Sequence, residues 1–276
     1  MCIRDRDHGG VETFYIDELS NQRLSPSDLD GWLTELEAAL PNLKINVIIE
    51  ACQSGSFVTP PQSISKANRV VIASTNDVND AKASKDGAYF SDHLLTWLHQ
   101  GYNLLVAFDE AREVASTVFV LQQAMIDANG NGIPNELTDG AIAASRSFAY
   151  AGTFSSDDWP PHIFAVQPPT AINNFSGVIQ ADVRDNQQVR QVWAVVYPPD
   201  YTPPTTGQEL QPEVLPTFLL TPVDNGSLYA GEFTGFTQTG LYRIVVQAED
   251  ADGLVARPVV IEVSAGSKLF LPLVNR

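Results

Sequence analysis

Apolar residues follow two different spacings in the first half of the chain. The segments 44–50 and 69–75 are short, apolar and rich in β-branched residues, which is typical of buried strands. Apolar residues recur at helical spacing over residues 25–40, 89–99 and 103–127. Strand patterns that alternate with helix patterns predict an α/β domain.

The second half of the chain has a different pattern, with short segments in which apolar and polar residues alternate. These segments are residues 177–185, 189–197, 227–233, 240–249 and 254–263. Roughly seven such strands within about 100 residues are typical of an immunoglobulin-like sandwich. Tyr242 is expected to hold a corner of this domain through its hydroxyl group.

The change of pattern predicts the domain boundaries. Residues 1–6 resemble a translated adapter sequence, so we exclude them and expect the native N-terminus to be missing. The other expected regions are an α/β domain at 7–154, a linker at 155–162, an all-β domain at 163–265 and a terminal strand or sorting tail at 266–276.

The chain is acidic throughout, with a net charge of -17. Residues 1–150 contain 10 Lys and Arg against 20 Asp and Glu, and the remaining residues contain 6 against 13. Such a surface repels phosphate backbones, so we expect no nucleic-acid partner. No apolar segment is long enough to predict a membrane span, and the pattern carries no information on oligomeric state.

One cysteine requires a chemical interpretation. Cys2 and Cys52 are the two cysteines of the chain, and Cys2 lies in the excluded tail, so we expect no disulfide framework. Cys52 follows the predicted strand at 44–50, and the ends of such strands often carry reactive groups. Taken alone, a cysteine beside a strand is usually a small core residue.

A histidine upstream provides a partner for this thiol. His8 lies 44 residues before Cys52, which leaves room for a helix and a second strand between them. A thiol becomes a competent nucleophile when a nearby imidazole accepts its proton. The amides of Gly9 and Cys52 are suited to stabilise the oxyanion that forms during acyl transfer. The other histidines, His93, His99 and His162, are interpreted as surface or packing residues.

The segments around His8 and Cys52 resemble the legumain-type cysteine peptidases. In that family one strand ends in His-Gly-Gly or His-Gly-Ser and a later strand ends in Glu-Ala-Cys before a Ser-Gly-Ser sequence, as in residues 7–10 and 50–56 here. The resemblance covers roughly residues 7–110. It implies a caspase-like domain with a mostly parallel sheet flanked by helices, incomplete at the N-terminus, which an all-β immunoglobulin-like sandwich follows.

The resemblance also implies the roles of individual residues. His8 is the general base, Cys52 is the nucleophile, and Glu50, Gln53 and Asp92 bind the substrate. Gln53 stands where the best-known members have a second glutamate. The expected specificity at P1 therefore stays open between Asn or Asp and, as in clostripain-like relatives, Arg or Lys.

A second motif indicates calcium. Residues 127–136 place oxygen ligands at alternate positions, with a glycine at the sixth, as calcium loops do. The motif resembles the aspartate-rich loops of thrombospondin-type and dockerin repeats. The expected ligands are Asp127, Asn129, Asn131 and Ile133. A capped turn at the end of a helix is the structural alternative.

Together these features predict a cysteine endopeptidase that acts on peptide or protein substrates and requires no cofactor, with structural calcium as an addition. The alternative is a non-catalytic binding or adhesion protein with a degenerate peptidase domain. Because immunoglobulin-like domains are common outside cells, we expect a secreted or cell-surface location for either function.

Overall fold

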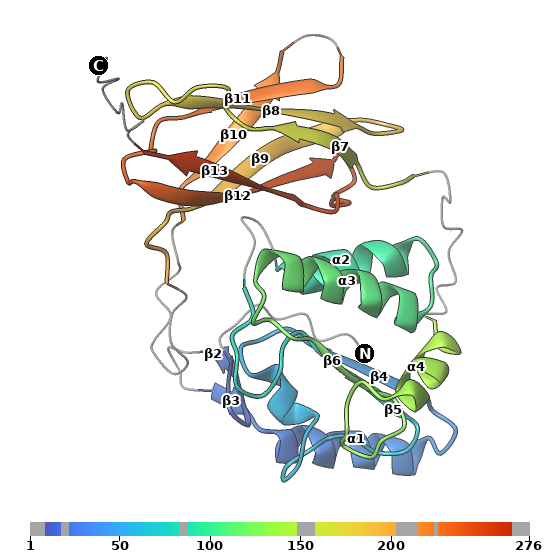
Figure 1. Cartoon of the computed structure of the whole chain (residues 1–276). Coiled ribbons are helices and arrows are strands. Elements are labelled where there is room, and N and C mark those ends of the chain that lie inside the picture. The colour runs from blue at the N-terminus through green and yellow to red at the C-terminus, as the bar shows by residue number, and fades with distance from the viewer. Residues whose placement is uncertain are drawn as a thin grey trace, which may run out of the picture. The chain divides into compact units, whose positions relative to one another are not determined.

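The computed structural model describes residues 9–17, 22–82, 88–147, 158–202, 215–223 and 226–266. His8, the predicted tail at 1–6 and the end of the chain from residue 267 lie outside these described residues. The chain divides into two compact units, and the second begins at Asp158. Figure 1 labels the elements of both units, and each unit is described by itself.

The first unit contains helices and short strands. Its helices are α1 (Pro26–Ala39), α2 (Tyr89–His99), α3 (Leu104–Val118) and α4 (Leu137–Ala144), with a 3-10 turn η1 (Ser54–Phe57). Its strands are β1 (Gly9–Gly10), β2 (Thr13–Asp17), β3 (Gln22–Leu24), β4 (Ile45–Ile49), β5 (Arg69–Ala73) and β6 (Met125–Asp127).

The start of α1 shows how the sequence determines a helix end. The Ser25 side chain accepts a hydrogen bond from the Asp28 amide, and the Asp28 carboxylate accepts one from the Ser25 amide. This capping box satisfies backbone donors that the first helical turn leaves without partners. Leu29 and Leu33 then bury the apolar face of the helix. The predicted helix at 25–40 is confirmed.

The sheet β4-β5-β6 lies between two layers of helices, as Figure 1 shows. Val70 and Ile72 of β5 pack in a cluster with residues of α2 and α3, whereas Val71 and Ala73 pack in a cluster with residues of α1. Successive side chains of a strand point to opposite faces, so β5 is buried on both sides. This layering places the end of β4 between the helix layers.

The predicted mostly parallel, caspase-like sheet is wrong. Among the described strands, β4 and β5 are the one parallel pair, and β6 pairs with β5 in the antiparallel direction. Strand residues also outnumber helical ones among the described residues, 35% to 23%. A continuous apolar pattern indicates that a strand is buried on both faces, but it does not encode the direction of its neighbours.

The predicted helix at 103–127 is too long. Helix α3 ends at Val118, and Met125–Asp127 form strand β6 instead. The misleading signal comes from Val120 and Leu121, which continue the apolar spacing although they are 74% and 46% exposed. Apolar residues on the surface therefore extended the helical pattern beyond the helix.

The second unit is built from antiparallel strands. They are β7 (His162–Gln167), β8 (Gly177–Arg184), β9 (Val189–Tyr197), β10 (Thr217–Pro222), β11 (Leu228–Phe233), β12 (Gly240–Asp250) and β13 (Val259–Ala265). They form one sheet in the order β13-β12-β9-β10-β11-β8-β7. The edge strands β13 and β7 also contact each other, so the sheet is a nearly closed barrel.

The predicted two-sheet sandwich is therefore replaced by one curled sheet. Both architectures bury alternate side chains, so the sequence pattern is the same for each. Strand β10 pairs with β9 on one side and with β11 on the other. These pairings join all seven strands into a single sheet. The Tyr242 hydroxyl accepts a hydrogen bond from the Gln238 amide at 2.8 Å, which confirms the predicted corner.

Candidate functional site

Cys52 lies just beyond the carboxyl end of β4, in the turn that leads to η1. Its side chain is buried, and its Sγ donates a hydrogen bond to the Ala81 carbonyl oxygen at 3.7 Å. Burial raises the pKa of the Cys52 thiol to about 11, and the negative charge of Asp80 adds to this effect. At neutral pH the thiol is therefore protonated in this environment.

The segment that follows His8 lies against the Cys52 peptide. A Cβ placed on Gly9 would stand 2.2 Å from the Cys52 carbonyl oxygen and 2.7 Å from the Ala51 Cβ. Only a glycine permits so close an approach. The two residues predicted to supply oxyanion-binding amides, Gly9 and Cys52, are thus neighbours in space. The structure does not describe His8 itself.

The residues after Cys52 join neighbouring segments. The Ser54 hydroxyl accepts a hydrogen bond from the Thr75 amide, and the Ser56 hydroxyl accepts one from the Glu12 amide. A Cβ on Gly55 would stand 2.5 Å from the backbone carbon of Asn76. The Ser-Gly-Ser sequence therefore positions the turn that carries Cys52.

Gln53 turns the chain at the end of β4. Its φ angle of 55° lies in the left-handed region, and its amide donates to the Asn79 carbonyl oxygen at 2.9 Å. A Cβ on Gly10 would stand 3.9 Å from the Gln53 Oε1, so the side chain extends toward β1. The residue predicted to bind substrate thus also has a structural role that the sequence did not indicate.

Glu50 reaches the first turn of α2. The Ser91 amide donates to its Oε2 at 2.7 Å, and the N-cap residue Ala88 supplies no side-chain hydrogen bond to that helix. Burial raises the pKa of Glu50 to about 7, against the opposing effect of hydrogen bonds from Ser74 and Ser91. Its Oε1 is buried and makes no hydrogen bond to a described residue. The charge of Asp92 also raises the pKa of Glu50, so these two residues, both predicted to bind the substrate, lie within electrostatic range of each other.

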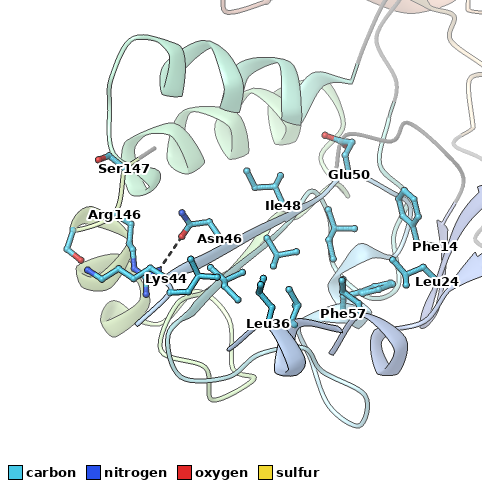
Figure 2. Close-up of a pocket in the computed structure, with 17 residues that line it drawn as sticks. Phe14, Leu24, Leu36, Lys44, Asn46, Ile48, Glu50, Phe57, Arg146 and Ser147 are labelled. Atoms are coloured by element: carbon cyan, nitrogen blue, oxygen red, sulfur yellow. Dashed lines mark hydrogen bonds between the residues drawn. The ribbon is translucent and has the colours of Figure 1, made fainter. Parts of the chain in front are cut away.

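A cavity of about 490 Å³ runs beside β4. Its walls are mainly apolar and include Phe14, Leu24 and Leu36. In Figure 2, Lys44 and Arg146 lie at one end of it and Glu50 at the other. Glu50, two residues before Cys52 in the chain, is among the residues that line the cavity. The sequence did not predict the cavity because its walls come from distant segments.

The predicted calcium loop is held by its own hydrogen bonds. Asp127 accepts hydrogen bonds from the amides of Gly130 and Gly132, at 2.7 and 2.6 Å. The side-chain oxygens of Asn129 and Asn131 accept from the amides two residues later, those of Asn131 and Ile133. In the part of the chain that the structure describes, no three His, Cys, Asp or Glu side chains are arranged to hold a metal ion. Calcium at this loop remains a prediction.

The remaining observations on the first unit concern two histidines, Asp80 and the length of the helices. His93 is buried in α2, and His99 lies in the last turn of that helix. Asp80, which the sequence did not single out, lies beside Cys52 and is 6% exposed. Of the helices described here, none is both long and apolar enough to cross a membrane.

No protein-family model and no curated protein matches the chain. Among solved structures, the chain is similar over 40% of its length to the PKD domain of an M14-like peptidase from a Thermoplasmatales archaeon, at 15% identity and a TM-score of 0.26, and covers 99% of that domain. It is similar over 45% of its length to a cell-surface-expressed multi-modular chitinase from a Paenibacillus species, at 10% identity and a TM-score of 0.29, and covers 10% of that chain. Similarities this low assign neither fold nor function.

Proposed function

We propose that the chain is a cysteine endopeptidase related to the legumain type, with Cys52 as nucleophile and His8 as general base. The observation that carries the proposal is the contact between Gly9 and the Cys52 peptide. His8 precedes Gly9 in the chain, and the proposal assigns the proton transfer to its imidazole.

The proposed reaction has two stages. His8 takes the proton from the Cys52 thiol as the sulfur attacks the carbonyl carbon of the scissile peptide bond, and the amides of Gly9 and Cys52 bind the resulting oxyanion. The C–N bond then breaks, the departing amine takes the proton from His8, and a thioester remains on Cys52. Water, deprotonated by His8, attacks the thioester, which releases the carboxylic acid and restores the thiol.

Two carboxylates support a basic residue at P1. Glu50 and Asp92 are close enough for the Asp92 charge to raise the pKa of Glu50. A guanidinium or ammonium group would neutralise this repulsion and supply a hydrogen bond to the Glu50 Oε1. Arg or Lys is therefore favoured over Asn or Asp at P1.

The experiment compares the full chain with Cys52→Ala and His8→Ala on peptides that have Arg, Lys, Asn or Asp at P1. Wild type is expected to cleave the basic peptides, Cys52→Ala to be inactive, and His8→Ala to lose on the order of 10² to 10⁴ in rate. Equal turnover by wild type and Cys52→Ala would end the proposal.

A second candidate function is a non-catalytic binding protein with a degenerate peptidase unit. The buried Cys52 thiol, with its pKa raised to about 11, favours it. Labelling with a peptidyl acyloxymethyl ketone distinguishes the two candidates, because this probe needs both an activated thiol and a formed binding pocket. Labelling of Cys52 that His8→Ala abolishes supports the peptidase, and no labelling of wild type supports the binding protein.

A further inference from the structure

Three carboxylates gather at one end of the second unit. Asp185 lies in the turn between β8 and β9, Asp250 is the last residue of β12, and Asp158 precedes β7. The Trp159 amide donates to the Asn186 side-chain oxygen at 3.1 Å, so the segment before β7 is attached to the β8–β9 turn.

The same turn is attached to the end of β12. Asp250 lies opposite Val189 in the antiparallel pairing of β12 with β9, at a point where the register shifts. The Ala251 amide also donates to the Gln188 carbonyl oxygen at 3.1 Å. Backbone pairing and the hydrogen bond from Trp159 to the Asn186 side chain therefore hold the three aspartates at a common end of the sheet.

One oxygen of Asp250 is satisfied and the other is not. Its Oδ1 accepts hydrogen bonds from the amides of Asp252 and Leu254, at 2.9 and 2.8 Å. Its Oδ2 is buried and receives no hydrogen bond from any described residue, although the whole residue is 1% exposed. A buried carboxylate oxygen without a donor is costly unless a cation or a proton compensates it.

The neighbouring carboxylates make this cost larger. The Oδ1 of Asp185 is likewise buried without a hydrogen bond from a described residue. The carboxylates of Asp158 and Asp185 lie within electrostatic range of Asp250. Asp158 is 5% exposed, so solvent screens these charges weakly. No described Lys or Arg is among the charges that act on Asp250.

We propose that Asp158, Asp185 and Asp250 form a calcium site at this end of the second unit. The hard oxygen donors fit Ca²⁺, which accepts carboxylates, backbone carbonyls and waters in a flexible coordination shell. Among the described residues, no three such side chains are already arranged to hold a metal ion, so binding at this site requires the aspartate side chains to reorient. This site is separate from the loop at residues 127–133, which belongs to the first unit.

The test measures thermal unfolding of the full chain in EDTA and in millimolar CaCl₂, with calorimetric titration of Ca²⁺ alone. Wild type is expected to gain roughly 3–8 °C with calcium and to bind with a dissociation constant on the order of 0.1–1 mM. Asp250→Asn keeps the Oδ1 acceptor and removes the charge, so it should weaken binding at least about tenfold and lose the shift.

The order of stabilities provides a second criterion. In EDTA, Asp250→Asn should unfold at a higher temperature than wild type because like-charge repulsion is removed, and in calcium this order should reverse. Asp252→Asn is the matched control, since it makes the same charge change at an exposed position two residues away, and it should keep the wild-type calcium shift.

Three results would overturn the site. The first is an equal calcium shift in wild type and Asp250→Asn. The second is a shift that Asn131→Ala abolishes and Asp250→Asn retains, which would place the ion in the loop at residues 127–133. The third is the absence of any calcium shift in wild type. None of these outcomes depends on peptidase activity.

Discussion

Gly9 is the residue on which the arrangement of the candidate site depends most directly. A side chain there would collide with the backbone of Cys52, whereas a Cβ placed on the neighbouring Gly10 would meet its nearest contact at 3.9 Å. Adjacent glycines of the same motif therefore have different physical roles, and a pair of alanine substitutions separates them.

Gly9→Ala is expected to destabilise the first unit by about 1–3 kcal/mol, because the added methyl group forces the backbone apart. It should also abolish the proposed peptidase activity. Gly10→Ala should change stability by less than about 0.5 kcal/mol. Chemical denaturation of both variants checks the prediction, and equal effects would show that the Gly9 contact is unimportant.

The high pKa of the Cys52 thiol predicts how fast this residue is alkylated. Because burial and Asp80 raise its pKa to about 11, reaction with iodoacetamide should be slow at neutral pH and rise roughly tenfold per pH unit toward pH 10. Mass spectrometry of the labelled full chain measures this rate. A plateau at neutral pH would instead indicate a preformed thiolate–imidazolium pair.

The N-terminus of helix α2 is capped by a residue from a different part of the chain. Its own N-cap residue, Ala88, has no side chain that can cap the helix. Instead Glu50, the residue after β4, accepts a hydrogen bond from the Ser91 amide. The positive end of the helix dipole favours the carboxylate, but burial outweighs this effect and raises the pKa of Glu50 from 4.5 to about 7.

The raised pKa of Glu50 makes the free energy of unfolding fall as the pH rises. The folded state binds the proton more tightly than the unfolded state, so this contribution is fully present below about pH 4.5 and is lost as the pH rises through about 7. Between these two pH values the free energy of unfolding of wild type should fall by about 1–3 kcal/mol relative to that of Glu50→Gln. Urea denaturation at several pH values measures it, and exposed Glu35→Gln is the control for the charge change.

Helix α1 is joined to β5 by a buried guanidinium group. Arg69 is fully buried and makes two hydrogen bonds to Glu37, at 2.7 and 2.6 Å, and one to Asp30, at 2.7 Å. Lysine cannot make the planar, bidentate hydrogen bonds that the guanidinium group makes. The exposed Arg112, which pairs with Asp109 at 2.8 Å, offers a comparison.

Arg69→Lys is therefore expected to lower the free energy of unfolding by about 2–4 kcal/mol, because the buried guanidinium loses its paired hydrogen bonds to two half-buried carboxylates. Arg112→Lys should cost less than about 0.5 kcal/mol. The difference in denaturation midpoint between the two variants is the measurement. Similar midpoints would mean that water replaces the buried guanidinium at little cost.

The whole molecule contains separate hydrophobic cores. The second unit has one cluster that its own strands supply, and the first unit has two clusters, one on each face of β4-β5-β6. We expect calorimetry to resolve two unfolding transitions. Arg69→Lys should lower one of them and Asp250→Asn should change the other. A single transition that both variants shift equally would contradict independent units.

Local patterns in the sequence were sufficient to predict many elements. The capping residues Ser25 and Asp28 and the spacing of the leucines predicted α1, and the β-branched segments predicted β4 and β5. These features depend on neighbours in the chain, so a sequence contains them directly. Cys52, Gly9, Glu50 and Asp92 were also predicted as a group, from the resemblance of their segments to the legumain-type peptidases.

Strand direction, sheet closure and the environment of buried polar groups were decided only by the tertiary structure. Alternation along a strand is the same in a sandwich and in a curled sheet, and an apolar segment does not specify a parallel neighbour. Likewise, the raised pKa of Glu50 and the unsatisfied oxygen of Asp250 arise where distant segments exclude water together. The sequence by itself determined which residues are apolar and which cap a helix, whereas burial by distant segments decided how the polar residues behave.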